Sequence, residues 1–135
     1  MTLEIQDITY RIQQRELIKK ISLSFEPGYL YGILGPNGSG KSTLLKVMAR
    51  IWTPTQGKLF WNGENLLAFS RIKMSKTISL VPQNPHPFFD FDVSHMVSMG
   101  LYPKNYSDGE TQKIVEKSLK QVDAWHLRHQ PLMTL

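Results

Sequence analysis

One spaced pattern of eight residues constrains this chain more than any other part of its sequence. The pattern has the form G-x-x-x-x-G-K-S, and its residues are Gly35, Pro36, Asn37, Gly38, Ser39, Gly40, Lys41 and Ser42. An almost continuous apolar run at 29–34 precedes the pattern, and apolar residues at helical spacing follow it to about Ile51. A strand buried on both faces, a glycine-rich loop and a helix in this order predict an α/β fold with a phosphate-binding loop.

The residue types of this loop suit a nucleoside triphosphate. Glycines permit backbone conformations that turn N–H groups inward and bring them close to phosphate oxygens. The helix that follows adds unpaired N–H groups and the positive end of its dipole. We expect the Lys41 ammonium to bind the β- and γ-phosphates and the Ser42 hydroxyl to bind Mg²⁺. The alternative is a glycine-rich turn that only caps a helix, and the strand and helix expected on either side of the loop argue against it.

The sequence on either side of the loop predicts a β-rich edge. Apolar and polar residues alternate roughly over 3–12 and 17–25, which predicts two strands. Asn62-Gly63 favours the positive φ angles of a type I′ turn, so we expect a hairpin with strands at 58–61 and 64–67.

The second half of the chain predicts one more strand and two helices. A short buried strand is expected at 77–81, where Pro82 stops it. The spacing of apolar residues over 93–100 predicts a short helix. Ser107-Asp108-Gly109-Glu110 matches a capping box at the start of another helix, on which Glu116 and Lys120 can pair.

Composition excludes several classes of function. The 135 residues include no cysteine, which removes disulfides, thiolate metal sites and thiol catalysis. The net charge of +5 comes from scattered residues, without a basic stripe interleaved with aromatics, so nucleic-acid binding is not predicted. The N-terminus lacks the pattern of a signal peptide, and no apolar run reaches the length of a membrane span, so we expect a soluble protein.

The loop and its surroundings resemble a known protein family. The stretch GPNGSGKSTLLK, residues 35–46, resembles the Walker A segment of ABC ATPases more than P-loops in general. Residues 57–63 resemble the family's G-x-(I/L)-x-(I/L)-x-G segment, Val81-Pro82-Gln83 the start of its Q-loop, and residues 93–97 the helix that follows. Gly100-Leu101-Tyr102-Pro103 is similar to the G-R-Y-P of ATPases that serve importers of iron–siderophores, haem, vitamin B12 and related metals, with leucine replacing the usual arginine.

The resemblance implies a P-loop NTPase fold of the ABC ATPase type with an N-terminal antiparallel β subdomain. It places this subdomain at 1–28 and 57–68, a P-loop core at 29–56 and 76–83, and the Q-loop with the start of a helical subdomain at 84–135. It covers about the first half of a full subunit, before the signature motif and the Walker B strand. No catalytic residue is therefore assigned. We expect very slow hydrolysis by this chain alone, and poor solubility or dimerisation through exposed sheet edges.

The resemblance also implies roles for individual residues. Tyr10 lies where the family places an aromatic that stacks on adenine, and a plain strand aromatic is the alternative. Thr43 completes the expected ATP-binding set that begins at Gly35, and Ser42 and Gln83 are the expected contacts of Mg²⁺. The implied partners are transmembrane permease subunits, reached through the Q-loop region, and a second ATP-binding subunit in a homodimer. The implied location is cytoplasmic, on the inner face of the cell membrane.

Three functional interpretations remain open. The first is the ATP-binding subunit of an ABC importer, which couples ATP binding and hydrolysis to uptake of a metal chelate, such as an iron–siderophore, or a similar solute. The second is a soluble ABC ATPase that has no role in transport. The third is a nucleotide-binding product without hydrolytic activity. A generic P-loop kinase fits less well because it requires neither the Tyr10 strand nor the Gln83 loop.

Other aromatic, histidine and methionine residues carry weaker signals. The phenylalanines after the Q-loop predict either an apolar patch for the membrane partner or a cover for the sheet edge; these are Phe88, Phe89 and Phe91. The tryptophans and the methionine pair are expected to pack in the core; these are Trp52, Trp61, Trp125, Met96 and Met99. The histidines lack the spacing of metal ligands; these are His86, His95, His126 and His129.

Overall fold

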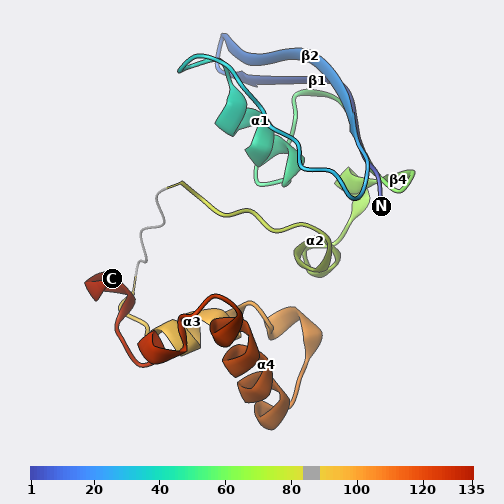
Figure 1. Cartoon of the computed structure of the whole chain (residues 1–135). Helices are drawn as coiled ribbons and strands as arrows, with labels where there is room; N and C mark the ends of the chain where they lie inside the picture. The colour runs from blue at the N-terminus through green and yellow to red at the C-terminus, as the bar shows by residue number, and fades with distance from the viewer. Residues whose placement is uncertain (84–88) are drawn as a thin grey trace. The chain divides into compact units, whose positions relative to one another are not determined.

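The computed structural model describes residues 1–83 and 89–135, which form two compact units at Met1–Leu80 and Val81–Leu135 (Figure 1). The helices and strands of the first unit are β1 (Leu3–Ile12), β2 (Arg15–Phe25), α1 (Lys41–Met48), β3 (Gln56–Trp61), β4 (Glu64–Asn65), the 3₁₀ turn η1 (Leu66–Ala68) and α2 (Arg71–Thr77). Those of the second unit are α3 (Val93–Met99), η2 (Tyr102–Lys104), α4 (Asp108–Gln121), η3 (Trp125–Leu127) and η4 (Leu132–Thr134).

The first unit contains an antiparallel sheet with the strand order β2-β1-β3-β4. Central strand β1 has the predicted bounds, and Ile5 in it lies opposite Leu23 of β2 and Leu59 of β3. The hairpin turn has positive φ at Asn62 (50°) and Gly63 (79°), as predicted for type I′. Its second strand is shorter than predicted, because the Asn65 side chain accepts the Leu67 N–H and begins η1.

Helix α1 packs on one face of this sheet and completes the core of the first unit. Its buried residues, Leu44 and Val47, face the apolar side chains of the sheet. The fully assembled core consists of Ile5, Ile8, Ile18, Leu44, Val47, Leu59, Leu66 and Phe69. The packing of α1 on the sheet fixes the direction in which its first turn, and the loop before it, project.

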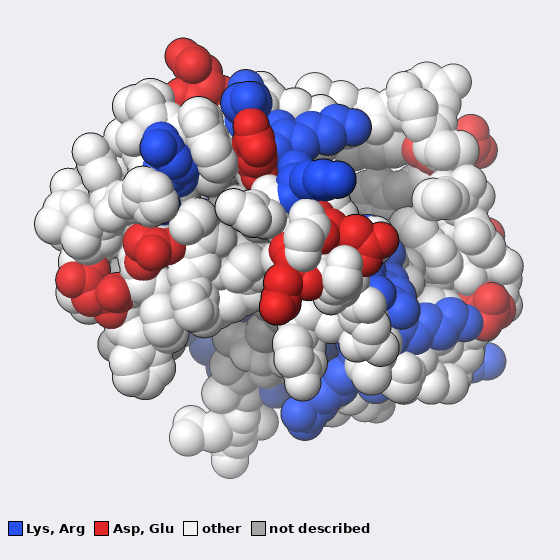
Figure 2. Space-filling view, turned by 90° about the horizontal axis from the view of Figure 1, so that it is seen from below, with Lys and Arg blue, Asp and Glu red and all other residues white. Residues whose placement is uncertain are grey.

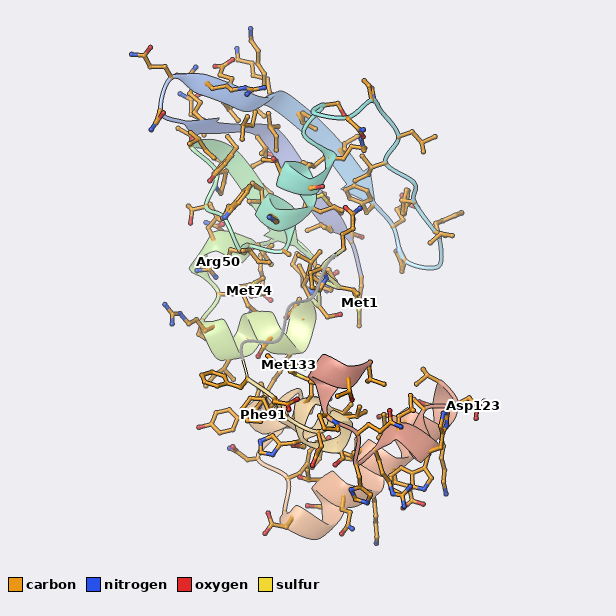
Figure 3. The ribbon with its side chains drawn as sticks, turned by 90° about the vertical axis from the view of Figure 1, so that its left-hand side faces the viewer. Met1, Arg50, Met74, Phe91, Asp123 and Met133 are labelled. Carbon is orange, nitrogen blue, oxygen red and sulfur yellow. The ribbon has the colours of Figure 1, made fainter. Side chains whose placement is uncertain are left out.

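Helix α1 ends at Met48, three residues before the predicted end. Arg50 has a φ of 55°, which is incompatible with a continuing helix. Its guanidinium, labelled in Figure 3, donates to the carbonyl of Leu66 at 3.1 Å and to that of Phe69. The tertiary bonds of Arg50 therefore stop a helix whose apolar spacing alone would extend it.

The prediction of strands at 29–34 and 77–81 is wrong. Neither segment pairs with a strand in the described structure, and α2 occupies the start of the second one. Ile33 and Ile78 pack partly against the core, but other apolar side chains of the two segments are exposed, with Leu30 at 101%, Leu34 at 94% and Val81 at 88%. Apolar runs become buried strands only where other strands flank them, and the described sheet provides no such neighbours.

The second unit is helical and has its own small core. Val93 of α3 packs with Val115 and Leu119 of α4. The capping box predicted at Ser107–Glu110 is confirmed, since each residue's side chain accepts the other's backbone N–H. The predicted pair of Lys120 and Glu116 is confirmed at 2.6 Å.

The two methionines of α3 do not join this core, contrary to the prediction. Met96 is 37% exposed and Met99 41% exposed, because the buried contacts of α3 come from Val93 and, in part, from Val97.

Acidic and basic side chains are mixed on the face of the molecule in Figure 2. Among the described residues, no helix is both long and apolar enough to span a membrane.

A close approach of β3 to β1 makes Gly57 difficult to replace. Gly57 has a φ of 96°, and an added Cβ would lie 2.6 Å from the carbonyl oxygens of Gln6 and Asp7. We expect Gly57→Ala to cost about 2–4 kcal/mol of folding free energy, from the left-handed backbone and the clash together. Gly63→Ala is the matched control, since Gly63 also has positive φ but open space around it. That control should cost only about 1–2 kcal/mol. Urea unfolding measures both, and equal losses would contradict the close approach.

The helix caps of the second unit predict a loss of stability in acid. Hydrogen bonds from Ser107 lower the pKa of Glu110 below its ordinary value of 4.5. The His95 backbone N–H and the Ser94 hydroxyl likewise lower the pKa of Asp92 below 3.8. A lowered pKa means that the contribution of each carboxylate to stability is present above its ordinary value and is lost as the pH falls through the folded value.

Far-UV circular dichroism should therefore show helix content falling as the pH drops below about 4. Glu110→Gln keeps an oxygen that accepts the Ser107 N–H but does not titrate, so this variant should lose part of the pH dependence. If Glu110→Gln loses helix content over the same pH range as wild type, the Glu110 carboxylate does not contribute to the acid sensitivity of the second unit.

Candidate nucleotide-binding site

The loop between Gly35 and Lys41 forms a closed turn. The Ser39 N–H donates to the Pro36 carbonyl at 3.3 Å. Gly38 and Gly40 have positive φ angles of 81° and 92°, in agreement with the predicted use of glycine to turn the backbone. The sequence pattern therefore corresponds to a defined turn directly before α1.

At Gly40 this turn lies in close contact with the main chain of β2. A Cβ on Gly40 would lie 2.6 Å from the carbonyl oxygen of Leu17, a main-chain atom of β2. Any larger residue would push the loop away from the sheet. Gly40 therefore fixes the loop on the sheet, and its left-handed backbone directs the chain into the first turn of α1.

The Lys41 side chain folds back over the loop. Its ammonium donates to the carbonyl oxygens of Gly35 at 2.7 Å and Pro36 at 2.8 Å. The positive charge therefore lies beside the backbone of the loop. The predicted contact of Lys41 with the β- and γ-phosphates stays a prediction.

The N-terminus of α1 lacks the usual side-chain cap. Its N-cap is Gly40, and its first turn contains no acidic residue. The other α-helices are each capped by a side chain, from Ser70, Asp92 and Ser107 respectively. The first-turn N–H groups and the positive helix dipole are therefore not neutralised by the chain itself.

These groups together fit a polyanion with a divalent cation. Residues 35–43 contain no acidic side chain, and their polar side chains are the Asn37 amide, the Lys41 ammonium and the hydroxyls of Ser39, Ser42 and Thr43. Ser42 is exposed and Thr43 is half-buried in the first turn of α1, so the Ser42 hydroxyl is accessible to Mg²⁺. The geometry can hold phosphate oxygens by backbone N–H groups and one fixed cation.

Tyr10 occupies the same unit as this loop and has an unforeseen partner. Its ring stacks on Trp52, with the centroids 5.3 Å apart and the planes inclined by 5°. Both residues are half-buried and pack against the core of the unit. Sequence reasoning identified Trp52 only as a packing residue, because no local pattern links it to a strand near the N-terminus.

Gln83 belongs to the other compact unit. It is exposed and lies in a bend after Pro82. Its predicted contact with Mg²⁺ or water stays a prediction. In the same unit Phe91 stacks on His95 at 4.8 Å and lies 5.7 Å from Phe89.

The remaining sequence predictions have mixed outcomes. Trp61 packs against the first core and Trp125 against the second, as predicted. Phe88 and His86 lie outside the described residues. Within the described residues, no group of three or more His, Asp and Glu side chains is arranged to hold a metal ion.

Comparison with known proteins shows similarity to ATP-binding subunits of importers. The chain is 35% identical over 128 residues to the hemin import ATP-binding protein HmuV of Bordetella avium, which covers 94% of this chain and 49% of that protein. It is 36% identical over 103 residues to the cobalamin import ATP-binding protein BtuD of Halobacterium salinarum, and this match covers 76% of this chain and 26% of that protein. The chain thus spans about half the length of the HmuV relative.

Solved structures show the same fold. The structure of cbiO1 from Clostridium perfringens, part of the ABC transporter complex cbiONQ, matches with a TM-score of 0.79 and 28% identity over 98% of this chain and 55% of that one. The ATP-binding cassette MJ0796, solved with ADP and Pi, matches with a TM-score of 0.81 and 22% identity. This match covers 98% of this chain and 62% of that one. Both neighbours confirm the predicted ABC ATPase fold class. The family model described as ABC transporter matches residues 18–135, and the chain therefore belongs to the ABC transporter family.

Proposed function

We propose that this chain binds ATP and Mg²⁺ as part of the ATP-binding subunit of an ABC importer. The observation that carries the proposal is the Lys41 ammonium over the loop, held at 2.7 Å from the Gly35 carbonyl at an uncapped helix N-terminus. Anionic groups are favoured there by the helix dipole, by free N–H groups and by the fixed positive charge.

The loop residues have distinct roles in this proposal. Backbone N–H groups of 35–40 bind phosphate oxygens, and Lys41 exchanges its carbonyl partners for the β- and γ-phosphates. The Ser42 hydroxyl holds the Mg²⁺, which supplies charge neutralisation of the phosphates when bound. The role of Gln83 in contacting Mg²⁺ is carried over only from the resemblance to the family. Thr43 contributes its N–H from the first turn of α1.

Tyr10 supports the base of the nucleotide. A flat aromatic ring stacks on any nucleobase, and such contacts contribute about 1–3 kcal/mol. One face of Tyr10 is already covered by Trp52, so we assign the base to the opposite face. The base and the triphosphate tail would then bind to residues of the same compact unit.

Relatives support import of a metal chelate as the activity of the whole transporter. The printed solutes of two relatives are hemin and cobalamin, and both compounds are metal chelates. Permease subunits are the proposed membrane partners, reached through the region around Gln83 and the exposed Phe89. A second ATP-binding subunit and a position on the cytoplasmic face of the membrane complete the proposal. No catalytic residue is assigned among the described residues.

Removal of the lysine ammonium tests the phosphate part of the proposal. Lys41→Ala should raise the Kd for MgATP about 10- to 100-fold, because a charged hydrogen-bond donor to the phosphates is lost. Isothermal titration calorimetry on the full chain measures this change. Lys58→Ala, which removes an exposed lysine from β3, is the matched control and should leave the Kd within about 2-fold. Equal Kd values for wild type and Lys41→Ala would refute the assignment.

Removal of the Tyr10 ring tests the base part of the proposal separately. Tyr10→Ala should raise the Kd for MgATP about 5- to 100-fold and leave that for magnesium tripolyphosphate within about 2-fold, since tripolyphosphate has no base to stack. Tyr10→Phe keeps the ring and should bind MgATP like wild type. If Tyr10→Ala binds MgATP normally, Tyr10 is a strand aromatic only.

A further inference from the structure

The candidate nucleotide-binding loop packs against one short part of β2. A Cβ on Gly40 would lie 2.6 Å from the Leu17 carbonyl oxygen and 3.7 Å from the Ile18 side chain. Ile18 also belongs to the core that contains Leu44 of α1. The end of the loop and the buried side of α1 therefore contact the same part of β2.

This part of β2 contains a β-bulge at Leu17. Arg11 of β1 lies opposite Glu16 of β2. The residue before Arg11 lies opposite Ile18, which leaves Leu17 as the extra residue of the bulge. Leu17 is half-buried and Ile18 is 4% exposed, whereas neighbouring side chains of a regular strand alternate between the two faces of the sheet. The bulge therefore shapes the surface that the loop contacts.

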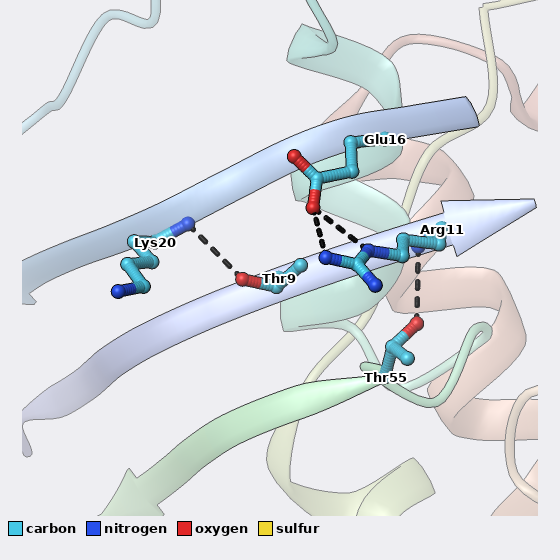
Figure 4. A network of polar contacts seen from close by, with 5 residues as sticks. All are labelled: Thr9, Arg11, Glu16, Lys20 and Thr55. Atoms are coloured by element: carbon cyan, nitrogen blue, oxygen red, sulfur yellow. Dashed lines mark hydrogen bonds and ion pairs between the residues drawn. The ribbon is translucent and has the colours of Figure 1, made fainter. Parts of the chain in front are cut away.

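An ion pair joins the two strands on one side of the bulge (Figure 4). The Arg11 Nε–H donates to the Glu16 Oε1 at 2.7 Å, and a second N–H of the guanidinium donates to the same oxygen. The Arg11 backbone N–H donates to the Thr55 hydroxyl oxygen at 3.0 Å. Because Glu16 directly precedes Leu17, these bonds fix the main chain of β2 next to the bulge.

A second bulge bounds the same segment on its other side. One extra residue of β2 lies opposite Thr9, and Lys20 has a φ of 44°. The Thr9 hydroxyl oxygen accepts the Lys20 N–H at 3.2 Å. Thr9 is itself 2% exposed, and its carbonyl oxygen accepts the Thr55 N–H at 2.8 Å. The segment from Glu16 to Lys20 is therefore bonded to β1 at both ends.

We propose that Glu16 and Thr9 are positioning residues for phosphate binding, which hold the bulge at Leu17 where the loop contacts it. This inference rests on the proposed binding of phosphate by the loop. Hydrogen bonds weaken steeply away from their preferred distance and angle, so loop N–H groups bind phosphate oxygens well only in a narrow range of geometry. A loop that its support already holds in that geometry avoids the cost of being ordered on binding.

Neutralisation of Glu16 tests one end of the segment by calorimetry on the full chain. Glu16→Gln should raise the Kd for magnesium tripolyphosphate and for MgATP by about the same factor, roughly 3- to 10-fold, because both ligands use the loop. Glu64→Gln is the matched control, since it breaks the exposed pair with Lys73 in the same unit and removes the same charge. It should leave both Kd values within about 2-fold. Equal changes in the two variants would overturn the role of Glu16.

A double-mutant cycle shows whether Glu16 acts through its ion pair. In a Glu16→Gln background, Arg11→Gln should have no further effect on either Kd, because the pair is already broken. A further loss equal to that of Arg11→Gln in wild type would contradict the proposal.

Removal of the Thr9 hydroxyl tests the other end of the segment. Thr9→Val leaves the Lys20 N–H without this acceptor and should raise both Kd values about 3- to 10-fold. Thr9→Ser keeps the hydroxyl and should bind both ligands like wild type. Equal binding by Thr9→Val and Thr9→Ser would refute the role of Thr9. If Thr9→Val does not fold, as judged by circular dichroism, the Glu16 variants decide the proposal.

Amide signals of the loop separate positioning from a general loss of stability. In the ligand-free protein, the ¹⁵N–¹H NMR signals of Gly40 and Lys41 should shift in Glu16→Gln and in Thr9→Val. They should stay in place in Glu64→Gln and in Gly63→Ala, which strains the turn between β3 and β4 instead. Weaker binding by Glu16→Gln with unshifted loop signals would contradict an effect through the loop.

Wild type and Lys41→Ala distinguish failure of this inference from failure of the proposed function. If wild type does not bind magnesium tripolyphosphate, or Lys41→Ala binds it equally well, phosphate binding by the loop fails and the positioning role fails with it. If Lys41→Ala weakens binding while Glu16→Gln and Thr9→Val bind like Glu64→Gln, only the positioning role is refuted.

Discussion

The contact between Gly40 and the main chain of β2 is the constraint on which the candidate nucleotide-binding loop depends. At this point a Cβ would lie 2.6 Å from the Leu17 carbonyl, so only glycine lets the chain pass from the loop into α1 while α1 packs on the sheet. The packing of Leu44 and Val47 then sets the axis of α1. Because Lys41 is the first residue of that helix, its ammonium returns to the carbonyls of Gly35 and Pro36. The core and the loop are thus parts of one geometric arrangement.

Local signals in the sequence predicted the elements that local chemistry determines. The Asn62-Gly63 turn, the Ser107–Glu110 capping box and the glycine loop need only nearby residues, and all three are present. The strands predicted at 29–34 and 77–81 depend on neighbouring strands, which the described sheet does not provide. A run of apolar residues indicates what a segment can bury, but pairing decides whether it forms a strand.

The candidate site likewise has one part that a local sequence pattern predicts and another part that depends on the fold. The proposed phosphate-binding part lies within one continuous stretch, so a single sequence pattern contains all of its candidate residues. The aromatic part joins Tyr10 of β1 to Trp52 beyond the end of α1, and no spacing rule links two such positions. The end of α1 was also mispredicted, because the bonds from Arg50 to the carbonyls of Leu66 and Phe69 are tertiary. The error at the helix end and the missed partner of Tyr10 therefore have one cause, the fold-dependent path of the segment after Met48.

Irregular pairing along β1 explains how one strand both fills the core and presents Tyr10. Consecutive residues Ile8 and Thr9 are both buried, at 0% and 2%, which strict alternation of a strand does not allow. The register with β2 shifts between Ile8 and Tyr10 and again between Tyr10 and Arg11. Such irregularities redirect side chains and increase local twist. Tyr10 is thereby half-buried beside the core, with Trp52 stacked on one face of its ring.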